Sequence, residues 1–185
     1  MDMNKFYELV KTRQSVRKYN PNKKVEKEKI ERCVEAARLA PSASNSQPWT
    51  FIVIDEPDLK QKVANATFSN TVSFNKFTLD APILVAVVTE KSKLMAQMGN
   101  FLKNQQYNLI DIGIAVEHFC LQATEESLGT CIMASSDEKK IKKLLNVPSK
   151  KRINIVMSLV YASDEDNLRD KIRKPFESII RYNSY

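Results

Sequence analysis

Glycine and histidine are scarce in this chain of 185 residues, and their scarcity excludes several kinds of site. The three glycines, Gly99, Gly113 and Gly129, lie too far apart for a G-x-G-x-x-G turn or a G-x-x-x-x-G-K-[ST] phosphate loop. The single histidine, His118, excludes H-E-x-x-H and every other zinc site that needs two histidines. A phosphate-bearing ligand would therefore need another kind of binding site, and no metal site is expected.

Cysteine and long apolar runs are also sparse. Cys33, Cys120 and Cys131 are widely spaced and odd in number, which predicts free thiols in a reducing cytoplasm rather than a disulfide framework. The first residues lack a signal-peptide pattern. The longest apolar runs are far shorter than the ~20 residues that a membrane-spanning helix needs. We therefore expect a cytoplasmic protein with no membrane partner.

The length and charge of the chain favour one globular domain with an anionic partner. Apolar residues make up 43% and charged residues 28%, which is an ordinary globular balance. The net charge of +7 suits nucleic acid, a membrane surface or a phosphorylated small molecule. Simple solubility would also account for the excess, so the charge alone does not decide between these partners.

The spacing of apolar residues predicts helices and strands in alternation, with a sheet covered by helices. Helices are expected over 4–11, from 26 to about 40, after a cap at Asp55, over 100–127 with Gly129 as C-cap, and after a cap at Asp137. Strands are expected over 49–54, 83–88, 130–134 and 153–161, the second of them fully buried. Residues 41–48 and 67–80 are predicted to be loops.

Two N-terminal segments could bind a ligand. Arg13, Ser15 and Arg17 alternate, so an extended backbone would turn two guanidinium groups and a hydroxyl to one side, where they suit a phosphate. Taken alone, this segment is better explained as a solvated basic connector. Two prolines stiffen the loop P-S-A-S-N-S-Q-P-W, whose small polar side chains suit the edge of a heteroaromatic ring. An ordinary turn before a strand is the alternative.

Two later segments complete the set of candidates. Lys171, Arg173 and Lys174 bring three cations within four residues, which a solvated tail would also explain. The segment 130–137 joins a strand to a helix cap, where backbone N–H groups are free to meet a ligand. His118 and Cys131 are expected to be structural, and no pair of carboxylates has a spacing that favours acid–base catalysis.

Taken together, these segments resemble the nitroreductase family of flavin enzymes. R-Q-S-V-R-K-Y resembles the first FMN motif of the family, R-x-S-x-R/K, and P-S-A-S-N-S-Q-P-W-T-F resembles the second. L-G-T-C-I-M resembles the family segment after the long core helix, and K-I-R-K-P resembles the C-terminal K-x-R-x-P element. The four segments occur in family order across nearly the whole chain.

The resemblance implies an α+β fold with a central mixed, mainly antiparallel sheet flanked by helices, in an intertwined homodimer. Residues 1–165 would form the FMN-binding domain, and residues 166–185 an extension that docks on the partner subunit. Arginine, lysine and serine side chains would hold the phosphate and ribityl chain, a loop from the partner would meet the ring, and backbone after the third strand would approach its reactive edge. The cofactor-binding residues so implied are Arg13, Gln14, Ser15, Arg17, Lys171 and Arg173, then Pro41, Ser42 and Asn45, then Ala134 and Ser135.

Two of these positions depart from the family pattern. Gln14 stands where a basic residue or histidine is frequent, so one polar contact to the cofactor is expected to be weaker. Ala134 and Ser135 replace a pair in which glycine is frequent, which bears on how closely the backbone can approach the ring.

The activity that the resemblance implies is hydride transfer from NADH or NADPH through FMN to a nitroaromatic, quinone or similar small acceptor, by a ping-pong mechanism. The flavin would carry the chemistry, so no catalytic side chain is expected. Candidates for stacking on a planar acceptor are the aromatic residues Phe68, Phe74, Phe101 and Tyr107, which could equally belong to the core.

Two alternatives remain open at this point. A nucleic-acid-binding module would use the net charge of +7, but acidic residues are interspersed with the basic ones and there is no basic stripe with interleaved aromatics. The same FMN fold could instead catalyse enone reduction, reductive dehalogenation or oxidative flavin chemistry.

Overall fold

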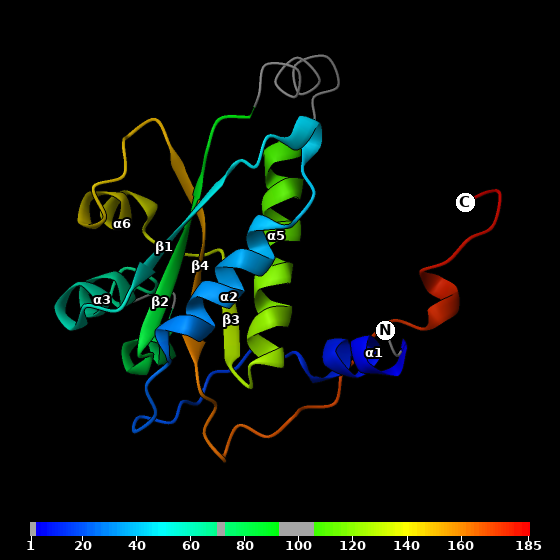
Figure 1. Ribbon diagram of the computed structural model, residues 1–185, viewed down its shortest axis with the longest axis horizontal. Helices are drawn as coiled ribbons and strands as arrows, with labels where there is room; N and C mark the ends of the chain where they lie inside the picture. Colours follow the sequence, from blue (N-terminus) through cyan, green and yellow to red (C-terminus); the bar gives the residue numbers. More distant parts are fainter. Residues whose placement is uncertain (1–2, 70–72, 93–105) are drawn as a thin grey trace.

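The computed structural model of the chain describes residues 3–69, 73–92 and 106–185 (Figure 1). The helices are α1 (Met3–Thr12), α2 (Lys27–Arg38), α3 (Pro57–Ala64), α5 (Tyr107–Glu125) and α6 (Glu138–Leu144). The strands are β1 (Trp49–Ile54), β2 (Ile83–Thr89), β3 (Gly129–Met133) and β4 (Arg152–Val160). Short 3-10 helices cover Ala43–Asn45, Lys76–Asp80 and Phe176–Ser178.

The four strands form one sheet in the order β1-β2-β4-β3, and each neighbouring pair is antiparallel. Strand β2 lies in the interior and is buried along its whole length, as its continuous apolar run predicts. The sequence predicts a mixed sheet. This prediction is wrong for these four strands, because all their pairings are antiparallel. The parallel pairing found in the described chain is an isolated bridge between Ser15 and Thr130.

Helices cover both faces of the sheet (Figure 1). Helices α2 and α5 pack on each other and on one face, where Cys33, Ala37 and Phe119 join Val85 and Met157 in the core. Helices α3 and α6 cover the other face through a second group of apolar side chains. The predicted α+β arrangement, with helices flanking a central sheet, is confirmed.

The ends of two helices differ from the sequence predictions. Helix α5 ends at Glu125, and the left-handed residue after it is Ser127, at φ 60°. Gly129 is therefore not its C-cap and is instead the first residue of β3. The N-cap of α3 is Glu56 rather than Asp55, because the Glu56 carboxylate accepts hydrogen bonds from the backbone N–H groups of Asp58 and Leu59.

Other boundaries agree with the predictions. Asp137 caps α6, its Oδ1 accepting the Lys140 N–H at 3.0 Å. Of the predicted helix 100–127, the structure contains α5 from Tyr107 to Glu125, and the predicted residues 100–105 lie outside the described part of the chain. Within the described residues, no helix is both long and apolar enough to cross a membrane.

Candidate functional site

The N-terminal motif lies as an extended segment along the edge strand β3 and then along the end of β4. The Val16 N–H donates to the Thr130 carbonyl at 2.9 Å, and the Asn20 N–H donates to the Tyr161 carbonyl at 3.0 Å. Val16 is buried, whereas Ser15 is half-buried and Arg17 is exposed. The backbone therefore has the extended conformation that the alternation of Arg13, Ser15 and Arg17 requires.

The C-terminal tail is bonded to this same segment. The Gln14 amide donates to the Asn167 carbonyl at 3.2 Å, and its oxygen accepts the Arg169 N–H at 3.1 Å. The Asp166 carboxylate accepts the Arg17 N–H at 2.9 Å. The Lys171 ammonium donates to the Arg13 carbonyl at 2.6 Å. The two basic motifs, about 150 residues apart in sequence, are thus brought together.

Their side chains form a cluster of positive charge. Two carboxylates offset it in part: Glu117 lies 3.5 Å from the Arg13 guanidinium, and Asp166 lies 2.6 Å from that of Arg169. Burial lowers the pKa of Lys171, and the nearby charges of Arg13, Arg173 and Arg169 lower it further. We call this group the cationic cluster; its members are Arg13, Arg169, Lys171 and Arg173. Arg17 belongs to the same extended segment, but its guanidinium lies over the Phe77 ring, 5.9 Å from the ring centre.

Sequence reasoning missed Arg169. It belongs to the cluster because its guanidinium bonds both the Asp166 carboxylate and the Ser15 carbonyl. The one sequence signal was its position two residues before the K-x-R element, in a segment where Asp and Arg alternate too densely to single it out.

The proline-rich loop is held by internal hydrogen bonds and is attached to the N-terminal part of α5. The Ala43 N–H donates to both oxygens of the buried Asp111 carboxylate, at 3.1 and 3.2 Å. Ser42 Oγ accepts the Gln47 N–H, and three residues of the loop have positive φ: Ser44, Asn45 and Gln47. Asp111 was also missed, although a lone aspartate in the apolar run L-I-D-I-G-I is a signal of a buried polar contact.

This loop is not part of the cationic cluster within one chain. It lies over Asp111 near the start of α5, whereas Arg13 contacts Glu117, six residues and about 9 Å farther along the same helix. Figure 1 shows the loop at one end of α5 and the N-terminal motif toward the other. Pro41, Ser42 and Asn45 are therefore separate from Arg13, Ser15 and Arg17.

The third group of predicted residues follows β3. Ala134 and Ser135 are exposed, and the Ser135 carbonyl accepts a hydrogen bond from the Asn75 amide at 3.1 Å. The same amide donates to the Thr67 carbonyl at 3.0 Å. Asn75 is only 3% exposed, so this buried side chain fixes the backbone beside Ser135. Sequence reasoning missed Asn75 because its partner Ser135 lies 60 residues farther along the chain.

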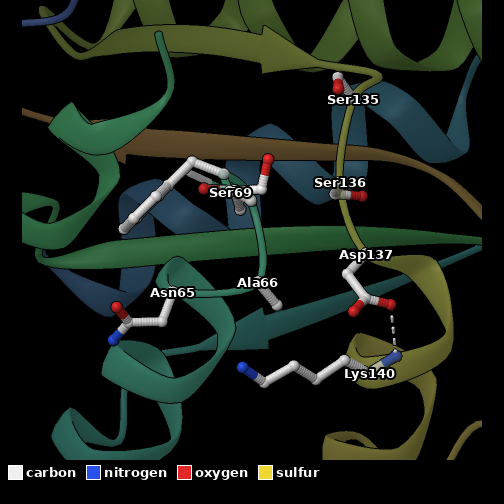
Figure 2. A pocket seen from close by; sticks show the side chains of 9 residues that line it. Asn65, Ala66, Ser69, Ser135, Ser136, Asp137 and Lys140 are labelled. Atoms are coloured by element: carbon white, nitrogen blue, oxygen red, sulfur yellow. Dashed lines mark hydrogen bonds between the residues drawn. The ribbon is translucent and has the colours of Figure 1, made fainter. Parts of the chain in front are cut away.

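A pocket of about 320 Å³ adjoins this backbone, between the end of α3 and the start of α6 (Figure 2). Of the four aromatic candidates, Phe68 lines it. Phe74 is 66% exposed, Tyr107 is the half-buried first residue of α5, and Phe101 lies outside the described residues. Polar and charged side chains complete the lining, among them Asn65, Ser136, Asp137 and Lys140.

His118 and Cys131, which are expected to be structural, lie in structural positions. His118 Nδ1 lies 3.3 Å from the Ala36 carbonyl and links α5 to α2. Cys131 is a buried free cysteine, and burial raises the pKa of its thiol, which disfavours the nucleophilic thiolate. The described residues contain no group of His, Cys, Asp and Glu that could hold a metal ion.

Comparison with known proteins identifies the family. A model of the Nitroreductase family matches residues 10–161, which include the N-terminal motif, the proline-rich loop and β3. The chain belongs to the nitroreductase family. A nitroreductase family protein from Clostridium novyi is 30% identical, with a TM-score of 0.74 over 89% of this chain and 88% of that one.

Two further relatives carry functional names. An FMN-dependent nitroreductase from Clostridium difficile is 26% identical, with a TM-score of 0.76 over 96% of this chain and 98% of that one. An iodotyrosine deiodinase from Thermotoga neapolitana is 28% identical over 99% of this chain and 100% of its own. The family match favours the flavin alternatives over a nucleic-acid-binding module.

Proposed function

We propose that this nitroreductase family chain is an FMN-dependent oxidoreductase that carries electrons from NADH or NADPH to a small planar acceptor such as a nitroaromatic or a quinone. The observation that carries the proposal is the cationic cluster, in which four basic side chains from the two ends of the chain lie together with two carboxylates. The similarity to an FMN-dependent nitroreductase supports the same cofactor.

The donor set of the cluster fits the phosphate of FMN. Arginine forks bind phosphate oxygens in pairs. A dianion would offset the repulsion among the basic side chains, which adds to burial in lowering the pKa of Lys171. Arg13, Ser15, Arg17, Lys171 and Arg173 would hold the phosphate and ribityl chain. The amide of Gln14 already binds the tail, so its contribution would be to position Lys171 and Arg173.

The remaining predicted contacts would belong to the flavin ring. Ala134 and Ser135 would lie near its reactive edge through their backbone, which Asn75 fixes. Pro41, Ser42 and Asn45 would contact the ring of the other subunit, because they lie apart from the cationic cluster of their own chain. When bound, FMN supplies hydride and electron transfer, so the chain has only to bind, orient and shield the reactants. Donor and acceptor would use one site in turn, which gives ping-pong kinetics.

A homodimer with an exchanged tail is part of the proposal. Residues 1–165 would form the FMN-binding domain. In the extension 166–185, the part beyond Lys171, which bonds this chain's own Arg13 carbonyl, would dock on the partner. Large apolar side chains of the tail are exposed in the single chain, with Ile172 at 92%, Phe176 at 65% and Tyr182 at 78%. Exposed apolar groups at this density are typical of an interaction surface. Three free, buried cysteines support a reducing, cytoplasmic location.

Reductive dehalogenation is a second candidate reaction on the same site. It is favoured by the deiodinase from Thermotoga neapolitana, whose match extends over both chains in full. This alternative keeps FMN, the cationic cluster and the dimer, and changes the acceptor.

The cofactor is tested by the visible spectrum of the purified protein and by titration of the apoprotein with FMN. We expect flavin absorption bands. Arg17→Ala and Arg173→Ala should each weaken FMN binding about 10- to 100-fold, since each removes charge-assisted hydrogen bonds. Arg38→Ala, which removes an exposed arginine paired with Glu35 on α2, is the matched control. A colourless protein that fails to bind added FMN would refute the proposal.

The reaction is tested by anaerobic reduction with NADH or NADPH and reoxidation with a panel of acceptors. Nitroaromatics, quinones, enones and an iodotyrosine distinguish the candidate reactions. Rapid reoxidation by the iodinated substrate alone would select dehalogenation, and rapid reoxidation by nitroaromatics or quinones would select the first candidate.

A further inference from the structure

The pocket beside Ser135 combines one apolar aromatic wall with a cation. Its volume of about 320 Å³ lies at the lower end of the range for small-molecule sites, so it suits a compound with a single ring. Phe68 is half-buried in the lining and offers a ring face for stacking. Ser135, in the same lining, is the residue proposed to lie near the reactive edge of the flavin.

The cation is Lys140. Figure 2 shows its side chain running from α6 along the pocket toward the side formed by Asn65. In the described part of the chain, no carboxylate lies within 4.0 Å of its ammonium group. The one acidic residue of the lining, Asp137, uses its Oδ1 to accept the backbone N–H of Lys140.

The surroundings add to this positive charge. Helix α6 has the sequence EKKIKKL, and Lys139 and Lys143 flank Lys140 on its surface. Its acidic residue, Glu138, is engaged by the Arg152 guanidinium at 2.8 Å. A negatively charged group that enters the pocket therefore meets a lysine that has no carboxylate partner among the described residues. Further lysines on the same helix add positive charge, which outweighs that of the single carboxylate in the lining, Asp137.

We propose that this pocket binds the carboxylate of a single-ring aromatic acceptor, with Lys140 as the residue that determines specificity and Phe68 against the ring. The proposal rests on the proposed function for its connection to the reaction, since the acceptor must reach the flavin. The preferred acceptor therefore carries a negative charge. Among compounds of equal size and reactivity, the anionic one binds more tightly.

The test compares 4-nitrobenzoate with 4-nitrobenzamide, which has nearly the same shape and no charge. Isothermal titration calorimetry of the flavin-loaded protein measures their binding without turnover. The wild type should bind the benzoate more tightly than the amide, and added salt should reduce this preference. Lys140→Ala should raise the Kd of the benzoate about three- to tenfold and leave that of the amide unchanged.

Two variants serve as controls. Lys139→Ala removes the same charge from the same helix outside the pocket and should leave both Kd values unchanged, and Lys140→Arg should retain the preference for the benzoate. An equal effect of Lys140→Ala on both ligands, no effect on either, or an equal effect of Lys139→Ala would overturn the assignment.

Steady-state reduction of the same pair separates this proposal from the function. If both compounds are reduced and Lys140→Ala changes neither KM, the pocket assignment fails and the function stands. If neither compound is reduced, the proposed reaction is wrong. The difference in Kd between the two compounds, measured by calorimetry, still tests the pocket assignment.

Discussion

Gly129 shows how a single residue positions the N-terminal motif on the sheet. A Cβ atom at this position would lie 2.5 Å from Cγ2 and 2.7 Å from Cβ of Val16. Val16 lies between Ser15 and Arg17 and donates its N–H to Thr130, the residue after Gly129. The absence of a side chain at Gly129 therefore lets the N-terminal motif approach β3 closely. Of the three glycines of the chain, Gly129 thus permits close packing of two segments and is not part of a phosphate-binding loop.

Gly129→Ala should destabilise the protein by about 1–3 kcal/mol, because the added methyl group overpacks against Val16. Urea denaturation measures the change. Gly113→Ala is the matched control: it lies inside α5 with nothing within 4 Å of an added Cβ, and it should stabilise by about 0.5–1 kcal/mol. Equal stability of the two variants would show that the segment does not depend on the close contact at Gly129.

At the scale of elements, α2 and α5 are joined by polar contacts at the C-terminal end of α5. The Arg32 guanidinium binds the Glu126 carboxylate, with Nη2 2.9 Å from Oε2. The Lys29 ammonium donates to the Glu126 carbonyl at 2.8 Å. The hydrogen bond from Arg32 is the main reason why the pKa of Glu126 lies below its ordinary value of 4.5. These contacts hold the two helices that cover one face of the sheet.

Glu126→Gln should reduce stability at neutral pH more than at acidic pH. Because the folded-state pKa of Glu126 is lowered, the stability it adds is present above about pH 4.5 and is lost as the pH falls through the folded value. Urea denaturation at pH 7 and pH 3.5 should therefore show a difference between wild type and variant that shrinks at the lower pH. Glu125→Gln, an exposed neighbour, is the control. A difference that stays constant with pH would contradict this role.

The elements themselves could be predicted from local patterns, whereas the ends of two helices, α3 and α5, could not. The run I-L-V-A-V-V predicts a buried strand because each residue prefers the interior, and β2 confirms it. A cap depends on which side chain reaches a free N–H, and this geometry selects Glu56 over the adjacent Asp55. Likewise Ser127 adopts the left-handed conformation, so Gly129 is free to begin β3.

Site residues that lie close together in the sequence could be predicted, whereas contacts between residues far apart in the sequence could not. The spacing of Arg13, Ser15 and Arg17 predicts the extended basic segment that the structure contains. Nothing local indicates that Asn75 reaches the Ser135 carbonyl, or that Asp111 holds the amide of Ala43. These buried polar groups have partners 60 and 68 residues away, and only the folded chain brings them together.

At the scale of the whole molecule, the predicted ligand contacts are divided between distant parts of one chain. The cationic cluster gathers around the tail, while the proline-rich loop lies over Asp111 near the start of α5. The tail, orange to red in Figure 1, extends away from the sheet with its apolar side chains exposed. The proposed homodimer would account for both observations, since a second copy of the chain would cover the tail and bring its own loop to the proposed FMN site.

Deleting residues 174–185 should therefore convert a dimer into a monomer while leaving Lys171 and Arg173 in place. Sedimentation equilibrium should give the full chain twice the mass of one subunit and the truncated chain the mass of one. FMN affinity should also fall, because Pro41, Ser42 and Asn45 of the partner no longer reach the ring although the phosphate residues remain. Circular dichroism controls for folding, and Phe176→Ser with Tyr182→Ser weakens the same contact without shortening the chain. A full-length chain that sediments as a monomer yet retains FMN would instead require one subunit to supply all the ring contacts.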